Sequence, residues 1–158
     1  AAMELGEVTV VAPAHQCSAM SQKITIRGDM RVDQAADFPV PVKAAYMVDG
    51  TPADCVKIAM QYLLEERPDY VFSGINDGYN AGFDIAYSGT LGAAFEAVMN
   101  GVPAIVIFEG GQSELLANVV AQIYAHLLQH PFHDPVGLAV CVELRYMTAS
   151  LMLGEWFE

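Results

Sequence analysis

Short apolar runs alternate with helical patterns along this chain, and this alternation is the feature that most constrains its fold. The runs expected to form strands are residues 7–13, 42–50, 70–74 and 103–111. Helical patterns begin at Thr51 and also cover residues 90–101 and 113–129. Strands that alternate with helices of this length favour right-handed βαβ units and a mostly parallel sheet. We therefore expect a three-layer α/β fold.

The helix that begins at Thr51 has the clearest local signals. Thr51 is expected to be its N-cap, and Pro52 then occupies the first helical position. Asp54 follows the cap by three residues, which is the spacing of a capping box. Pro68 lies just beyond the expected helix end, because proline cannot continue a helix. These residues predict a well-bounded helix.

Two other segments have weaker patterns. Residues 24–33 alternate apolar and polar side chains around Gly28-Asp29, which predicts a small hairpin. Residues 136–147 could form an edge or central strand, but no cap or turn follows them. We therefore expect one α/β core over residues 1–133 and an unassigned, divergent tail over residues 134–158.

Composition excludes several classes of protein. The chain has 158 residues, of which 54% are hydrophobic, and its net charge is −12. An acidic protein lacks the basic surface that binds duplex DNA or RNA. No apolar run is long enough to span a membrane, and the three cysteines lack zinc-site spacing. A cytoplasmic protein is therefore expected. Because the chain is acidic, any phosphorylated ligand needs a local source of positive potential.

Two polar loops follow expected strands, in residues 12–25 and 73–90. Ligands of open α/β sheets bind beyond the carboxyl ends of the strands, so these loops are the candidate site. Ser88, Gly89 and Thr90 directly precede a helix, whose free N–H groups and dipole favour an anion. Helix capping is the commoner role of such residues. The pattern therefore allows two interpretations of these residues, a phosphate site and a simple helix cap.

Other polar residues of these loops allow a functional and a structural interpretation. Asn76 lies in Asn-Asp-Gly, so its side chain could bind a ligand or form a turn. Asp84 could serve a metal, an acid–base step or a cap. Ser18 is a loop serine, and His15 is the histidine nearest the sheet edge. Spacing alone favours ordinary loop and surface roles for them.

The motifs together resemble the SurE family, the stationary-phase survival proteins that act as metal-dependent nucleotidases. The matching segments, in order, are VTVVAP, a loop serine followed by IT, GTPADCVK, PDYVFSGIN, GYNAGFDIAYSGTLGAAFEA and GVPAI. The resemblance covers about residues 8–107. It implies a Rossmann-like core and hydrolysis of a nucleoside monophosphate to a nucleoside and phosphate.

The resemblance also implies roles for individual residues. Ser18 and Asn76 match metal ligands of the family, with one Mg²⁺ or Mn²⁺ ion per subunit. Asp84 lies in the same motif with a supporting role. Four residues match the segment that lines the phosphate side of the site: Asn80, Ser88, Gly89 and Thr90. The family forms homo-oligomers, so a dimer or tetramer is expected for the parent protein.

One family motif has no counterpart. The family begins with a central strand that ends in NDDG, whose two aspartates bind the metal and include the catalytic carboxylate. This chain has no Asp-Asp pair, so its catalytic residues are unknown and its first strand is expected to be missing. An inactive or impaired nucleotidase with unpaired strand edges is therefore expected. The alternatives are a non-catalytic nucleotide- or phosphate-binding module and an inactive fragment.

Overall fold

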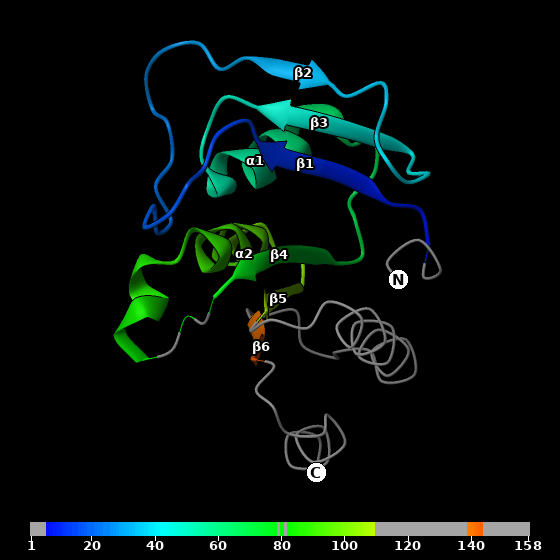
Figure 1. Cartoon of the computed structure of the whole chain (residues 1–158). Coiled ribbons are helices and arrows are strands. Elements are labelled where there is room, and N and C mark those ends of the chain that lie inside the picture. The colour runs from blue at the N-terminus through cyan, green and yellow to red at the C-terminus, as the bar shows by residue number, and fades with distance from the viewer. Residues whose placement is uncertain (1–5, 79, 81, 110–138, 144–158) are drawn as a thin grey trace.

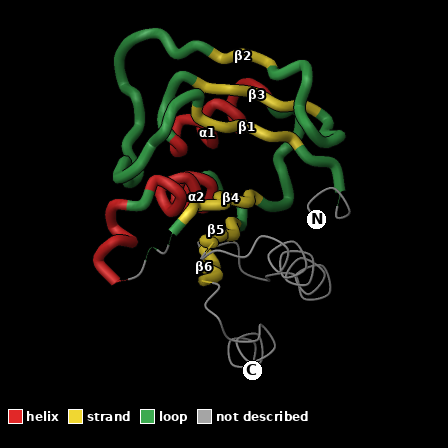
Figure 2. The backbone as a smooth tube through the Cα atoms, viewed as in Figure 1, coloured by secondary structure: helices red, strands yellow, loops and turns green. Residues whose placement is uncertain are grey.

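The computed structural model describes residues 6–78, 80, 82–109 and 139–143, and it has strands and helices in alternation (Figures 1 and 2). The strands are β1 (Thr9–Pro13), β2 (Val32–Gln34), β3 (Ala44–Val48), β4 (Val71–Asp77), β5 (Ala104–Glu109) and β6 (Ala139–Glu143). The helices are α1 (Pro52–Ile58), a π-helical continuation (Ala59–Leu63), a 3-10 helix (Gly82–Tyr87) and α2 (Gly89–Met99). The expected α/β class is confirmed.

The described strands form two sheets, with the orders β1-β3-β2 and β4-β5-β6. β1 runs parallel to β3, and β5 runs parallel to both β4 and β6. Of the strands that the structure describes, only β2 is antiparallel to its partner, β3. Pairing is therefore mostly parallel, as predicted, and the connection between the parallel strands β4 and β5 passes through α2.

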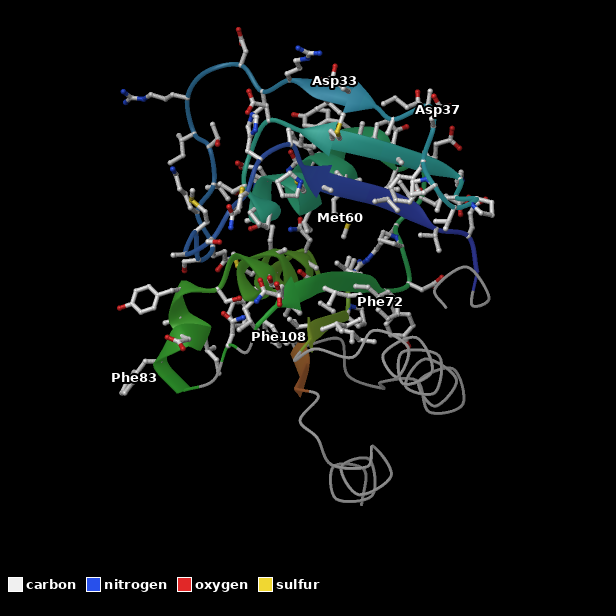
Figure 3. All side chains as sticks on the ribbon, in the orientation of Figure 1. Asp33, Asp37, Met60, Phe72, Phe83 and Phe108 are labelled. Carbon is white, nitrogen blue, oxygen red and sulfur yellow. The ribbon has the colours of Figure 1, made fainter. Side chains whose placement is uncertain are left out.

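Helices α1 and α2 pack against each other and against the sheets. α1 contacts β1, while α2 contacts β4 and β5. One apolar cluster joins Val56 of α1 to Leu91 of α2 and to Phe108 of β5, which is fully buried (Figure 3). A second cluster places Cys55 and Ile58 of α1 against Val48 of β3. The α1–α2 contact therefore joins the parts of the fold that carry the two polar loops.

The predicted hairpin over residues 24–33 is wrong. Within this segment only Val32 and Asp33 belong to a strand, and they pair with β3 rather than with residues 24–27. The reason is a competing partner: the Thr25 N–H donates to the carboxylate of Asp54 at 2.8 Å. The segment therefore bonds to the start of α1 instead of folding back on itself.

The later part of the chain adds one strand. β6 lies inside the segment 136–147 that was expected to be a possible strand, and it pairs with β5 from Ala104–Ala139 to Phe108–Glu143. The helix predicted over residues 113–129 and the boundary predicted after His133 lie outside the described residues. Among the residues that are described, no helix is long and apolar enough to cross a membrane.

Candidate functional site

The carboxyl ends of β1, β3 and β4 lie toward the same side of the molecule, at the left of Figure 1. The loop between β1 and β2 carries Ser18 and reaches down to the start of α2 (Figure 1). The segment between β4 and α2 carries Asn80 and Asp84. Topology therefore brings the two polar loops to one edge, as parallel strands do.

The loop that carries Ser18 lies directly on the first turns of α2. The Ser21 N–H donates to the Tyr87 carbonyl oxygen at 2.9 Å. A Cβ atom on Gly89 would lie 3.0 Å from the Cys17 carbonyl oxygen, and one on Gly92 would lie 2.6 Å from the Ser21 carbonyl carbon. Glycine at both positions lets the two backbones approach. The structure thus brings the Ser18 loop together with Gly89.

Ser88 is the N-cap of α2. Its backbone is extended, with φ −67° and ψ 120°, and its hydroxyl accepts a hydrogen bond from the Leu91 N–H at 3.2 Å. The side chain is buried, with 6% of its surface exposed. The capping role is therefore confirmed, yet the hydroxyl keeps its own proton and can still donate it to an anion.

Thr90 is linked to β4 through its backbone. The buried Ser73 hydroxyl donates to the Thr90 carbonyl oxygen at 2.7 Å. This bond joins the strand that ends near Asn76 to the first turn of α2. The N–H groups at this helix start therefore have a fixed position relative to the end of β4.

Asn76 lies in β4, where it pairs with Phe108 of β5. Its side-chain nitrogen donates to the Gly78 carbonyl oxygen at 3.0 Å, and more weakly to that of Asp77 at 3.5 Å. Both contacts use the nitrogen, so the side-chain oxygen is the atom that can face a cation. The turn interpretation is wrong for Asn76, because β4 continues to Asp77 and the bend follows at Gly78, and the ligand interpretation stays a prediction.

Asp84 and Asn80 have no described contact with the other predicted site residues. Asp84 is exposed on the 3-10 helix, and its carboxylate makes no hydrogen bond or ion pair with the residues that the structure describes. Its neighbour Phe83 is 92% exposed and projects away from the body of the molecule (Figure 3). Asn80 is half-buried. Their predicted roles at the site stay predictions.

Ser18 and Asn76 do not by themselves make a complete metal site. Oxygen donors suit Mg²⁺ and Mn²⁺, but both side chains are neutral, and these ions usually bind with carboxylates. Within the described ranges, no group of three or more His, Cys, Asp or Glu side chains could hold a metal ion. The Ser18 hydroxyl accepts a hydrogen bond from Gln16 at 3.2 Å. The charge that such a site needs is absent from these residues.

A set of buried polar contacts at the start of α1 was missed by sequence reasoning. Asp54, 1% exposed, accepts from the Thr51 N–H at 2.9 Å, from the Thr25 N–H at 2.8 Å and from the Thr25 hydroxyl at 2.8 Å. The Thr51 hydroxyl donates to the Lys23 carbonyl oxygen. We call these four residues, Lys23, Thr25, Thr51 and Asp54, the loop clamp. The capping-box spacing predicts the contacts between Thr51 and Asp54, but no local pattern indicates the bonds to residues 23 and 25.

The loop clamp stabilises the charged form of Asp54. Burial alone would raise the pKa of this carboxyl, but hydrogen bonds from Thr25 and Thr51 outweigh burial and hold the pKa below its ordinary value. A carboxyl whose pKa is lower in the folded than in the unfolded protein contributes stability above the unfolded pKa. This contribution is lost as the pH falls through the folded pKa.

We therefore expect Asp54→Asn to change the acid sensitivity of the fold. The free energy of unfolding of the original chain should exceed that of the variant near neutral pH. The gap should narrow as the pH falls below about 4, the pKa of an aspartate in an unfolded chain, and through the lower pKa of Asp54 in the folded protein. Urea unfolding of both proteins at each pH measures this difference, with Asp37→Asn at an exposed position as the control. A gap that does not depend on pH would contradict the assigned pKa shift.

Comparison with known proteins identifies one family. The family model described as Survival protein SurE matches residues 1–145. A 5'-nucleotidase SurE of Crocosphaera subtropica is 39% identical over 152 residues, which is 94% of this chain and 54% of that protein. A 5'-nucleotidase SurE of Carboxydothermus hydrogenoformans is 43% identical over 136 residues, covering 80% of this chain and 50% of that protein.

The crystal structure of the SurE protein from Aquifex aeolicus has the same fold. Its TM-score is 0.74 at 36% sequence identity, over 91% of this chain and 58% of that one. The present chain spans about half the length of the curated relatives it matches. Matched over most of its own length by sequence and by structure, the chain belongs to the SurE family.

Proposed function

We propose for this sequence the function of a phosphoric monoester hydrolase of the 5'-nucleotidase type, which cleaves nucleoside monophosphates to nucleoside and phosphate, with catalysis impaired in the 158 residues alone. The observation that carries the proposal is the seating of the Ser18 loop on the first turn of α2, beside Ser88, Gly89 and Thr90. The names of the related SurE 5'-nucleotidases support the same activity.

The start of α2 is the proposed phosphate-binding element. Its first N–H groups lack helical partners and carry the positive end of the helix dipole, so they favour an anion. The Ser88 hydroxyl can donate one further hydrogen bond, and Asn80 and Thr90 extend the polar lining. This element offers the local positive potential that a chain of net charge −12 needs to hold a phosphate.

In the proposed reaction, a water oxygen attacks phosphorus and the bond from phosphorus to the ester oxygen breaks. The nucleoside leaves with a proton on that oxygen, and inorganic phosphate remains. Phosphate monoesters react very slowly without a catalyst, so stabilisation of charge on the phosphoryl oxygens must supply much of the rate. In this chain, the N–H groups of α2 and the Ser88 hydroxyl would bind and orient those oxygens.

One divalent ion per subunit, Mg²⁺ or Mn²⁺, is part of the proposal. Ser18 and Asn76 would contribute neutral oxygen ligands, and Asp84 would support the site from the neighbouring helix. Because these residues supply no carboxylate cluster, the metal ligands are incomplete and no catalytic residue is assigned. We therefore propose that the 158-residue polypeptide alone is inactive or severely impaired. It would then act as a phosphate- or nucleotide-binding module.

The test is to measure binding and turnover separately. The purified 158-residue chain is titrated with AMP by calorimetry, with and without Mn²⁺, and phosphate release is assayed under the same conditions. We expect AMP to bind with little or no phosphate release. Chelator-sensitive turnover would contradict the impairment, and absence of AMP binding under both conditions would contradict the phosphate site.

A matched pair of variants at Ser88 isolates the anion site from helix capping. Aspartate and asparagine cap helices as well as serine does, so neither should unfold α2. Ser88→Asp places a negative charge beside the phosphate and should abolish AMP binding, whereas Ser88→Asn should retain most of it. Equal binding by the two variants would place the phosphate elsewhere.

The remaining parts of the proposal concern the whole protein. We propose a homo-oligomer, a dimer or tetramer, located in the cytoplasm and without affinity for nucleic-acid duplexes. The acidic charge supports the last point, because phosphate backbones attract basic surfaces.

A further inference from the structure

We propose that Asp54, with Thr51, is a positioning residue for the phosphate site, because the loop clamp holds the Ser18 loop on the start of α2. This inference rests on the proposed function and extends it to residues that do not contact the substrate. Asp54 and Thr51 lie at the start of α1, whereas the phosphate site is at the start of α2.

The loop has one anchor on each helix. On α1, Asp54 and Thr51 bind the backbone at Thr25 and Lys23. On α2, the Ser21 N–H binds the Tyr87 carbonyl oxygen, and the Cys17 carbonyl oxygen lies against Gly89. Ser18 lies between Cys17 and Ser21 in sequence. The position of Ser18 is therefore set by the backbone contacts of its loop with α2. The bonds of the same loop to α1 hold these contacts in place.

Two further contacts support the same placement. The Cys17 thiol donates to the Gly50 carbonyl oxygen at 3.7 Å, directly before the N-cap of α1. The Gln22 side chain donates to the buried carboxylate of Glu96 in α2 at 3.4 Å. Glu96 in turn lies 3.5 Å from the Lys57 ammonium of α1. The loop thus fills the junction between the two helices.

The clamp requires a carboxylate at position 54. One oxygen of Asp54 accepts from the Thr25 N–H, and the other accepts from the Thr51 N–H. An asparagine has only one acceptor oxygen, so its NH₂ group would face an N–H group in either orientation. Asp54→Asn therefore breaks one arm of the clamp while it keeps the size of the side chain.

Two substitutions at position 51 test the clamp, one that removes the hydroxyl and one that retains it. The Thr51 hydroxyl accepts from the Asp54 N–H and donates to the Lys23 carbonyl oxygen. Thr51→Val has nearly the same shape but neither bond. Thr51→Ser keeps the hydroxyl and should restore both bonds.

The experiment measures binding and loop protection in the same proteins. The 158-residue chain and its variants are titrated with AMP and with inorganic phosphate, and the dissociation constant is read from the backbone amide shifts of residues 89–91. Hydrogen exchange of the Ser21 and Thr25 amides is measured without ligand. Val102→Ala, at a fully buried position outside the clamp, controls for general loss of stability.

We expect Asp54→Asn and Thr51→Val to weaken binding by about tenfold, the effect of one lost buried hydrogen bond, and to speed exchange at Ser21. Thr51→Ser and Val102→Ala should bind within about twofold of the original chain. Unchanged binding by Asp54→Asn, when the original chain binds, would overturn the positioning role alone. If the original chain binds neither AMP nor phosphate, the proposed function and this inference both fall.

Discussion

Gly92→Ala is expected to force the Ser18 loop away from α2 and to lower the free energy of unfolding by about 2 kcal/mol. A Cβ atom on Gly92 would lie 2.6 Å from the Ser21 carbonyl carbon and 2.9 Å from the Gln22 Cα atom, and it would lie closer still to the Ser21 carbonyl oxygen. These are backbone atoms, which cannot rotate away as a side chain can. The loop or the helix must therefore move.

The higher helix propensity of alanine opposes this effect. The change in the free energy of unfolding is negative only if the clash costs more than the propensity gains. Alanine in a helix is favoured over glycine by about 1 kcal/mol, so the substitution would stabilise an isolated α2. Overpacking against a fixed backbone typically costs about 1–3 kcal/mol, and here the added atom overlaps several backbone atoms. The clash should therefore outweigh the propensity gain, and AMP binding should fall with it.

Urea unfolding and hydrogen exchange at Ser21 measure the two consequences of Gly92→Ala. Gly78→Ala is the matched control, because its Cβ atom would meet nothing within 4 Å although φ is +107°. That control should cost only the strain of the left-handed backbone, about 1 kcal/mol, and should leave Ser21 protected. A neutral or stabilised Gly92→Ala would show that the loop does not need this close contact.

The order of strands and helices could be predicted because its signals are local. Thr51 and Ser88 do cap α1 and α2, since a cap depends only on residues within one helical turn. The hairpin expected around Gly28 failed because the Thr25 amide has a distant partner in Asp54. Alternation of apolar residues cannot reveal that partner, which lies 29 positions along the chain.

The candidate site shows the same limit. The sequence placed Ser18 and Gly89 in separate loops, and the parallel topology predicts only that both loops reach one edge of the sheets. The contact of the Ser18 loop with α2 depends on two glycines, Gly89 and Gly92, that admit the backbone of the loop. In the sequence, Gly92 looks like an ordinary small residue on a helix. The turn expected at Asn76 is wrong, because pairing with Phe108 of β5 extends β4 to Asp77.

The edge of β1, which has no second strand partner among the described residues, leads to the other large expected effect, self-association of the 158-residue chain. Within the described residues, β1 pairs only with β3. The Ala14 N–H donates to the Val48 carbonyl oxygen at 2.8 Å, and the Val8 carbonyl oxygen accepts from Lys43. In a parallel ladder alternate residues bond to the same neighbour, so the backbone groups of Thr9 and Val11 face away from β3. Such an edge can pair with a second copy of the chain.

Thr9→Pro should reduce this association without breaking the β1–β3 ladder. Proline removes the outward N–H at the first residue of the strand, a position where proline is tolerated. Thr9→Val keeps the N–H and the preference for a strand, so it is the matched control.

Sedimentation velocity over a range of concentrations distinguishes the outcomes for the β1 edge. We expect the original chain and Thr9→Val to form larger species as concentration rises, and Thr9→Pro to need about tenfold more protein, which corresponds to one lost hydrogen bond. A chain that stays monomeric and melts cooperatively would show that the β1 edge is protected. Equal association of all three proteins would place the contact at another edge. Because pairing at β1 occupies backbone rather than the start of α2, association by this route should leave AMP binding unchanged.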